Sequence, residues 1–158
     1  MGLTNEEICQ GIAHAKTIAG RTNLITLGEV LVIDDCYNAN PVSMKASLDV
    51  LAQADGRKIA VLGDMGELGE NEREMHYDVG KYAANTGVDI LFCCGTLSEE
   101  LAKGAQRGHT KVMYFADREK LTQTLINFVE AGDTVLVKAS HFMEFPKIVK
   151  ALEEALEA

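Results

Sequence analysis

Residues 58–95 read KIAVLGDMGELGENEREMHYDVGKYAANTGVDILFCCG, in which two apolar runs flank a polar segment with helical spacing. Both runs are apolar on consecutive residues, which is typical of strands that are covered on both faces. Parallel neighbouring strands need a crossover connection, and a helix usually supplies it. The stretch therefore predicts a strand–helix–strand unit of a parallel sheet.

The same alternation continues to the end of the chain. Further strands are predicted at KVMYF (111–115) and DTVLVKAS (133–140), and further helices at SEELAKGA (98–105), REKLTQTLINFVEAG (118–132) and FPKIVKALEEALEA (145–158). Such a pattern is the signature of a sheet with helices on both faces. We expect an α/β fold of three layers, with a mostly parallel, Rossmann-like sheet of about six strands.

The segment before residue 58 adds a different unit. NLITL (23–27) and EVLVID (29–34) are β-rich runs that meet around Gly28, which predicts an antiparallel hairpin or a bent strand pair. Pro41 begins a helix whose apolar positions face the sheet. Further upstream, Thr4 and Glu7 form a capping-box signature for a short helix.

Composition limits the kinds of function. The chain has 158 residues, 47% of them hydrophobic and 25% charged, which fits one globular domain. Its net charge of −9 disfavours nucleic acid or an anionic membrane as the main partner. No run approaches the roughly 20 apolar residues of a membrane span, and no secretory signal opens the chain. We expect a cytoplasmic protein.

The cysteines and histidines indicate no metal site. Cys9, Cys36, Cys93 and Cys94 have neither CxxC nor metal-ligand spacing, and the four histidines are scattered. The sequence predicts buried free thiols at the adjacent pair.

Three polar clusters follow predicted strands: residues 34–40, residues 63–69 (GDMGELG) and residues 138–141 (KASH). In open α/β sheets, ligands bind beyond the carboxyl ends of the strands. Segments that are distant in sequence are therefore expected to share one edge of the sheet, and this convergence is the main functional signal in the pattern.

The first cluster, DDCYNANP, offers the most varied chemistry. Its carboxylates can accept hydrogen bonds from ribose hydroxyls or help to hold a divalent cation, and Tyr37 can pack on a flat base. The plainer interpretation is an Asx-rich turn in which Asn40 caps the helix that Pro41 begins.

The other two clusters are less specific. GDMGELG has neither GxGxxG nor Walker spacing, so it predicts a shaped loop rather than a phosphate cradle. Lys138 could reach a phosphate or a carboxylate, or could simply be a solvated strand end.

Four stretches together resemble the C-terminal domain of the bacterial Mur ligases: AGR (19–21), IDDCYNANPVSMKASLDVL (33–51), KIAVLGDMGELGE (58–70) and VLVKAS (135–140). DD-x-YNANP with LGDMxELG is similar to the branch that joins D-alanyl-D-alanine to UDP-N-acetylmuramoyl-tripeptide. The resemblance implies the last third of a three-domain, ATP-dependent ligase. Residues 1–18 would be a linker helix from the central domain, and residues 19–158 the C-terminal domain.

The resemblance also implies roles for residues. By similarity, the ATP-binding residues would be Arg21, Asp35, Tyr37, Asn38 and Asn40. The peptide and the incoming dipeptide would lie near Asp64, Glu67, Lys138 and Ser140. Mg²⁺ would be held by the missing central domain, and this domain alone would bind neither ATP nor a metal tightly. No catalytic set is complete here, so the isolated chain is expected to be inactive.

One departure from the family pattern concerns the last cluster. Relatives commonly carry lysine–glycine–serine followed by arginine or asparagine, whereas this chain reads Lys138, Ala139, Ser140, His141. A direct role for His141 in holding substrate is therefore open.

An alternative is a self-contained, receiver-like phosphoacceptor module that binds Mg²⁺. It would use Asp34, Asp35, Asp64 and Lys138. The order of elements disagrees, because Asp64 follows the very next strand of the series, and no proline follows Lys138.

Overall fold

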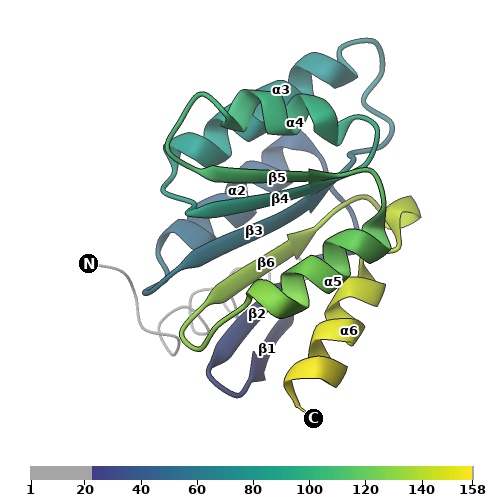
Figure 1. The fold of residues 1–158 in the computed structure, drawn as a ribbon. Helices are drawn as coiled ribbons and strands as arrows, with labels where there is room; N and C mark the ends of the chain where they lie inside the picture. The colour runs from purple at the N-terminus through teal and green to yellow at the C-terminus, as the bar shows by residue number, and fades with distance from the viewer. Residues whose placement is uncertain (1–22, 158) are drawn as a thin grey trace.

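The computed structural model describes residues 23–157, which form one six-stranded sheet between two layers of helices (Figure 1). The strands lie in the order β1-β2-β6-β3-β4-β5, and only the β1–β2 pair of this sheet is antiparallel. The predicted α/β fold class is confirmed. The strands are β1 (Asn23–Leu27), β2 (Val30–Asp34), β3 (Lys58–Gly63), β4 (Ile90–Cys94), β5 (Lys111–Phe115) and β6 (Thr134–Lys138).

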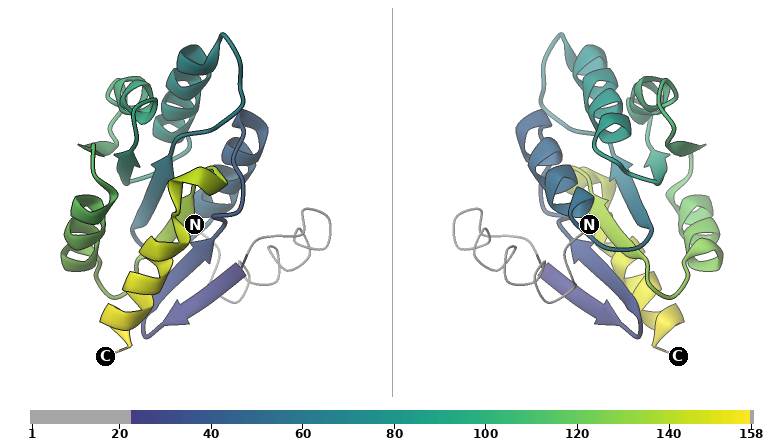
Figure 2. Two further views of the ribbon diagram at one scale, coloured as in Figure 1. Left: turned by 90° about the vertical axis from the view of Figure 1, so that its right-hand side faces the viewer. Right: turned by 90° about the vertical axis from the view of Figure 1, so that its left-hand side faces the viewer.

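Every described helix except the last connects parallel strands as a crossover, and a short 3-10 turn and the last helix follow β6. Figure 2 shows α2, α3 and α4 on one face of the sheet and α5 and α6 on the other. The helical elements are α2 (Pro41–Ala52), α3 (Glu72–Asn85), α4 (Ser98–Ala105), α5 (Arg118–Phe128), η1 (His141–Met143) and α6 (Pro146–Leu156).

The hairpin prediction is confirmed at the start of the sheet. Leu27 pairs with Val30, so Gly28 and Glu29 form a two-residue turn. Gly28 has φ 63°, which an L side chain rarely adopts. The helix predicted upstream, with Thr4 and Glu7, lies outside the described residues, and so does Arg21.

Alternate residues of the parallel strands bury their side chains on opposite faces. In β3, Ala60 and Leu62 pack with the layer of α2, α3 and α4, whereas Ile59 and Val61 pack with that of α5 and α6. This explains why the run is apolar on consecutive residues.

Two glycines set the distance between α3 and α4. A Cβ on Gly80 would lie 1.9 Å from the carbonyl oxygen of Leu101, and one on Gly104 would lie 2.1 Å from that of Tyr77. The helices can therefore pack only because both positions lack a side chain.

Helix α5 ends earlier than predicted, at Phe128 instead of residue 132. The Arg57 guanidinium donates to the Phe128 carbonyl (2.9 Å) and binds the Asp133 carboxylate through two nitrogens (2.9 and 2.7 Å). Asp133 in turn accepts from the Glu130 amide at 2.8 Å. These contacts hold residues 129–133 as a turn, so the helix stops.

Within residues 23–157, no helix is long and apolar enough to cross a membrane.

Candidate functional site

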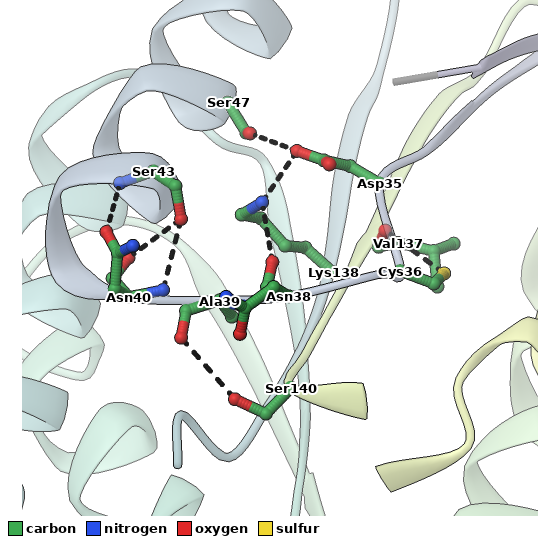
Figure 3. A network of polar contacts seen from close by, with 10 residues as sticks. All are labelled: Asp35, Cys36, Asn38, Ala39, Asn40, Ser43, Ser47, Val137, Lys138 and Ser140. Atoms are coloured by element: carbon green, nitrogen blue, oxygen red, sulfur yellow. Dashed lines mark hydrogen bonds and ion pairs between the residues drawn. The ribbon is translucent and has the colours of Figure 1, made fainter. Parts of the chain in front are cut away.

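The three polar clusters meet at one edge of the sheet, as predicted. Strand β6 lies between β2 and β3, and all three run parallel. Their carboxyl ends, at Asp34, Lys138 and Gly63, are therefore neighbours. Figure 3 shows the first and third clusters joined by polar contacts.

An ion pair buried at this edge joins Asp35 to Lys138. The Lys138 Nζ lies 2.7 Å from Asp35 Oδ2, and the two residues are only 2% and 9% exposed. Ser47, on α2, donates its hydroxyl to the same carboxylate oxygen at 2.7 Å. Because a buried charge is costly without partners, these three groups stabilise one another.

Asn38 and Asn40 contact groups of the protein itself: Asn38 bonds to Ala39 and Lys138, and Asn40 bonds to Ser43 on α2. The Asn38 carbonyl accepts from Lys138 Nζ at 3.1 Å, and its side-chain oxygen accepts from the Ala39 amide. Asn40 caps α2: its side chain accepts from the Ser43 amide, and Ser43 Oγ accepts from the Asn40 amide. The predicted cap, with Pro41 at the first helical turn, is confirmed.

Tyr37 is the residue of this segment that presents an aromatic surface outward. It is 54% exposed, and its ring lies 6.0 Å from the ring of His141. Phe142, next to His141, is 62% exposed. Flat, exposed rings at the edge of the sheet suit stacking on a planar ligand.

Ser140 links the second cluster to the first. Its hydroxyl accepts from the Gly66 amide at 2.7 Å and donates to the Ala39 carbonyl at 3.4 Å. Its own amide donates to the Asp64 carbonyl at 3.0 Å. One buried serine therefore contacts both of the loops that the resemblance connects with ligands.

Asp64 is directed toward the start of α4. Its Oδ1 accepts from both the amide and the hydroxyl of Ser98, each at 2.8 Å. A carboxylate is favourable at a helix N-terminus. Gly95 leaves room for it, because a Cβ there would lie 2.3 Å from Asp64 Oδ1.

Glu67 is the exposed residue among those predicted for the second cluster. Its φ is 58°, a conformation that is unusual for a residue other than glycine. Its carboxylate is therefore presented to solvent by a strained turn.

Three residues that support the site were missed from the sequence: Ser47, His76 and Ser98. His76 is fully buried, and its Nε2 accepts from the Met65 amide at 2.9 Å while Nδ1 contacts the Glu72 carbonyl. The sequence did contain a signal that His76 is buried, since it precedes Val79 and Ala83 at helical spacing on the buried face of α3.

The cysteines of the described part are all buried and free, namely Cys36, Cys93 and Cys94, which confirms the prediction for the adjacent pair. Burial raises the pKa of the Cys36 thiol well above its ordinary value, and the nearby Asp34 carboxylate raises it further. Among residues 23–157, no group of three His, Cys, Asp or Glu side chains could hold a metal ion.

The receiver-like alternative is not favoured by this geometry. Its phosphoacceptor would be Asp64, which is only 6% exposed and is bonded to Ser98. A phosphoryl donor would have to displace those contacts.

The fold and the site define a class of protein, a doubly covered α/β domain whose polar clusters meet at the strand ends. Comparison with known proteins agrees with this class. Residues 20–141 match the family described as Mur ligase, glutamate ligase domain. The chain therefore belongs to the Mur ligase family.

Relatives indicate a branch of that family. UDP-N-acetylmuramoyl-tripeptide–D-alanyl-D-alanine ligase from Bacillus subtilis (strain 168) is 34% identical over 98% of this chain, and its namesake from Escherichia coli (strain K12) is 35% identical over 98%. The chain spans 35% and 34% of these two relatives, about a third of their length.

Solved structures show the same likeness. MurF ligase from Thermotoga maritima, in complex with ADP, matches 87% of this chain with a TM-score of 0.75 and 31% identity, and the match covers 31% of that protein. MurF from Acinetobacter baumannii matches 85% with a TM-score of 0.79 and 34% identity, covering 30% of that protein.

Proposed function

We propose that this chain works as the C-terminal part of an ATP-dependent ligase that joins D-alanyl-D-alanine to UDP-N-acetylmuramoyl-tripeptide in the cytoplasm, as a step of peptidoglycan precursor synthesis. The observation that carries the proposal is the alignment of ligases of that name over 98% of the chain. The convergence of the matching stretches at one edge of the sheet supports it.

The nucleotide side of the site would be the segment 35–40, together with Arg21. Tyr37 offers an exposed ring for a base, and Asp35 keeps one carboxylate oxygen outside its contacts with Lys138 and Ser47. Asn38 and Asn40 would line the adenosine through backbone and amide groups. ATP would supply the phosphoryl group that activates the peptide carboxylate, and Mg²⁺ would be held by other parts of the enzyme.

The dipeptide side would be the loop 64–69 and the end of β6. Glu67 is exposed and can contact a ligand directly. Asp64 and Ser140 are buried and bonded, so they would act mainly by shaping the loops that line this side, whereas the buried Lys138 is bonded to the segment 35–40.

The chain would complete a site that it does not form alone. Its relatives are about three times longer, and a domain that closes over bound nucleotide assembles its site only on closure. We expect the isolated chain to bind ATP weakly and to catalyse no joining, and we expect neither nucleic acid nor membrane as a partner.

The test uses the full-length protein that carries this chain, with ATP, Mg²⁺, UDP-N-acetylmuramoyl-tripeptide and D-alanyl-D-alanine. Joining of the dipeptide should depend on ATP and should release phosphate. Tyr37→Ala removes an exposed ring without breaking a buried ion pair, and it should raise the KM for ATP about tenfold, as expected for a stacking contact of ~1–3 kcal/mol. The surface variant Lys147→Ala is the control for the Tyr37 substitution. A wild-type enzyme that joins no dipeptide would refute the proposed function.

A further inference from the structure

The ammonium group of Lys138 lies in a place where solvent cannot stabilise it. The residue is 2% exposed, at the carboxyl end of β6. Its Nζ lies 2.7 Å from Asp35 Oδ2 and 3.1 Å from the Asn38 carbonyl oxygen. A buried ammonium is costly unless it is paired. These two contacts therefore offset the cost of burying the Lys138 charge.

Both contacts of Lys138 fall on the same short segment. Asp35 begins the segment 35–40 and Asn38 lies in its middle, so one ammonium group binds the segment at two positions, as Figure 3 shows. Ser47 binds the same carboxylate from α2, and Ser140 contacts the next carbonyl, that of Ala39. The segment is thus held between β6 and α2.

We propose that Lys138 is a positioning residue that fixes the segment 35–40 through Asp35 and Asn38, instead of contacting the dipeptide. The inference rests on the proposed nucleotide role of that segment. Its ammonium also neutralises the Asp35 carboxylate, which would otherwise repel the phosphates of an anionic nucleotide.

Loss of Lys138 should loosen the segment before it affects the rest of the sheet. Lys138→Met would leave the Asp35 carboxylate buried without its cation and the Asn38 carbonyl without its donor. The amides of Ala39 and Asn40, which donate to Asn38 Oδ1 and to Ser43 Oγ at the start of α2, report on its order.

The first experiment is amide hydrogen exchange on the chain itself. Lys138→Met should speed exchange at Ala39 and Asn40 by about tenfold or more, whereas strands β3 and β4 should change less. The control is Lys147→Met, which removes a lysine of a surface pair with Glu144. Equal exchange at Ala39 and Asn40 in Lys138→Met and wild type would overturn the proposal.

A second measurement needs no change at Lys138. In wild type, the ammonium signal of Lys138 in ¹⁵N NMR should be visible because the group is shielded and bonded, and Asp35→Asn should shift it. An ammonium signal that is unaffected by Asp35→Asn would refute the pairing. This holds even if Lys138→Met fails to fold.

Kinetics of the full-length enzyme then separate positioning from direct contact. Lys138→Met should raise the KM for ATP about tenfold and leave the KM for D-alanyl-D-alanine nearly unchanged, and it should have little further effect in an Asp35→Asn background. A rise confined to the KM for the dipeptide would show a direct contact and overturn the proposal. If wild type joins no dipeptide, the proposed function fails, while exchange and NMR still decide the role of Lys138.

Discussion

Glu67 combines an exposed carboxylate with a backbone conformation that favours glycine. Its φ of 58° costs a residue with a side chain about 1–2 kcal/mol. The residues just before it are held in place, since the Met65 amide is bonded to His76 and the Gly66 amide to Ser140. Strain of this kind often accompanies function.

Substitutions at Glu67 should separate the backbone from the carboxylate. Glu67→Val should lower the free energy of unfolding by about 1–2 kcal/mol, because a β-branched residue tolerates positive φ poorly. Glu67→Gly should stay within about 1 kcal/mol of wild type. Urea denaturation of the chain measures both, and equal stabilities would show that the loop relaxes.

At the residue scale, the sequence predicts where polar groups gather better than it predicts what each one contacts. Asn40 was predictable because a cap depends on its immediate neighbours. The partners of Asp35 were not, because Lys138 lies 103 residues away in sequence. His76 is similar: its bond to the Met65 amide depends on how α3 packs against the loop.

At the element scale, strands and helices were predictable where the hydrophobic pattern is long. The runs at 58–63 and 90–94 became β3 and β4 because both of their faces are buried. The predicted end of α5 was wrong because Arg57, far upstream, holds the turn after Phe128. The close approach of α3 and α4 also gave no clear signal, since a glycine within a helix usually only weakens it.

The substitution Gly80→Ala should test whether α3 and α4 need a glycine where they come close together. The added Cβ would meet the Leu101 carbonyl, which is backbone and cannot rotate away. Despite alanine's better helix propensity, we expect a loss of about 1–3 kcal/mol in the free energy of unfolding. Lys81→Ala, at an exposed position of the same helix, should stay within about 0.5 kcal/mol. Urea titration compares the two, and a stabilised Gly80→Ala would contradict the packing.

At the scale of the whole molecule, both layers of the core contain thiols that burial keeps protonated. Cys93 packs with α2, α3 and α4, and Cys36 packs with the opposite layer. Burial is the main cause that raises each thiol pKa above the ordinary 9.0. Both thiols should therefore resist alkylation in the folded chain.

Alkaline pH should destabilise the protein for this reason. Above pH 9 the unfolded chain releases the thiol protons and the folded chain keeps them. The contribution of the buried thiols to the free energy of unfolding is therefore complete below the unfolded pKa and is lost as pH rises above it. In this range, each pH unit should lower the free energy of unfolding by about 1.4 kcal/mol for Cys36 and by as much again for Cys93. Urea titrations between pH 7 and about 10.5 measure the slope, and Cys36→Ala should reduce it. A slope that Cys36→Ala leaves unchanged would contradict the assignment.

The position of β6 also bears on how the protein is made. Strand β6 alone joins the β1–β2 hairpin to the β3-β4-β5 sheet, yet among the described residues it follows the other five strands in chain order and leaves the ribosome after them. A nascent chain that stops before Thr134 would hold two separate half-sheets, each with an open, apolar edge where β6 should insert. Productive folding of the sheet would then wait until β6 has been translated, and termination before β6 would yield material prone to aggregate.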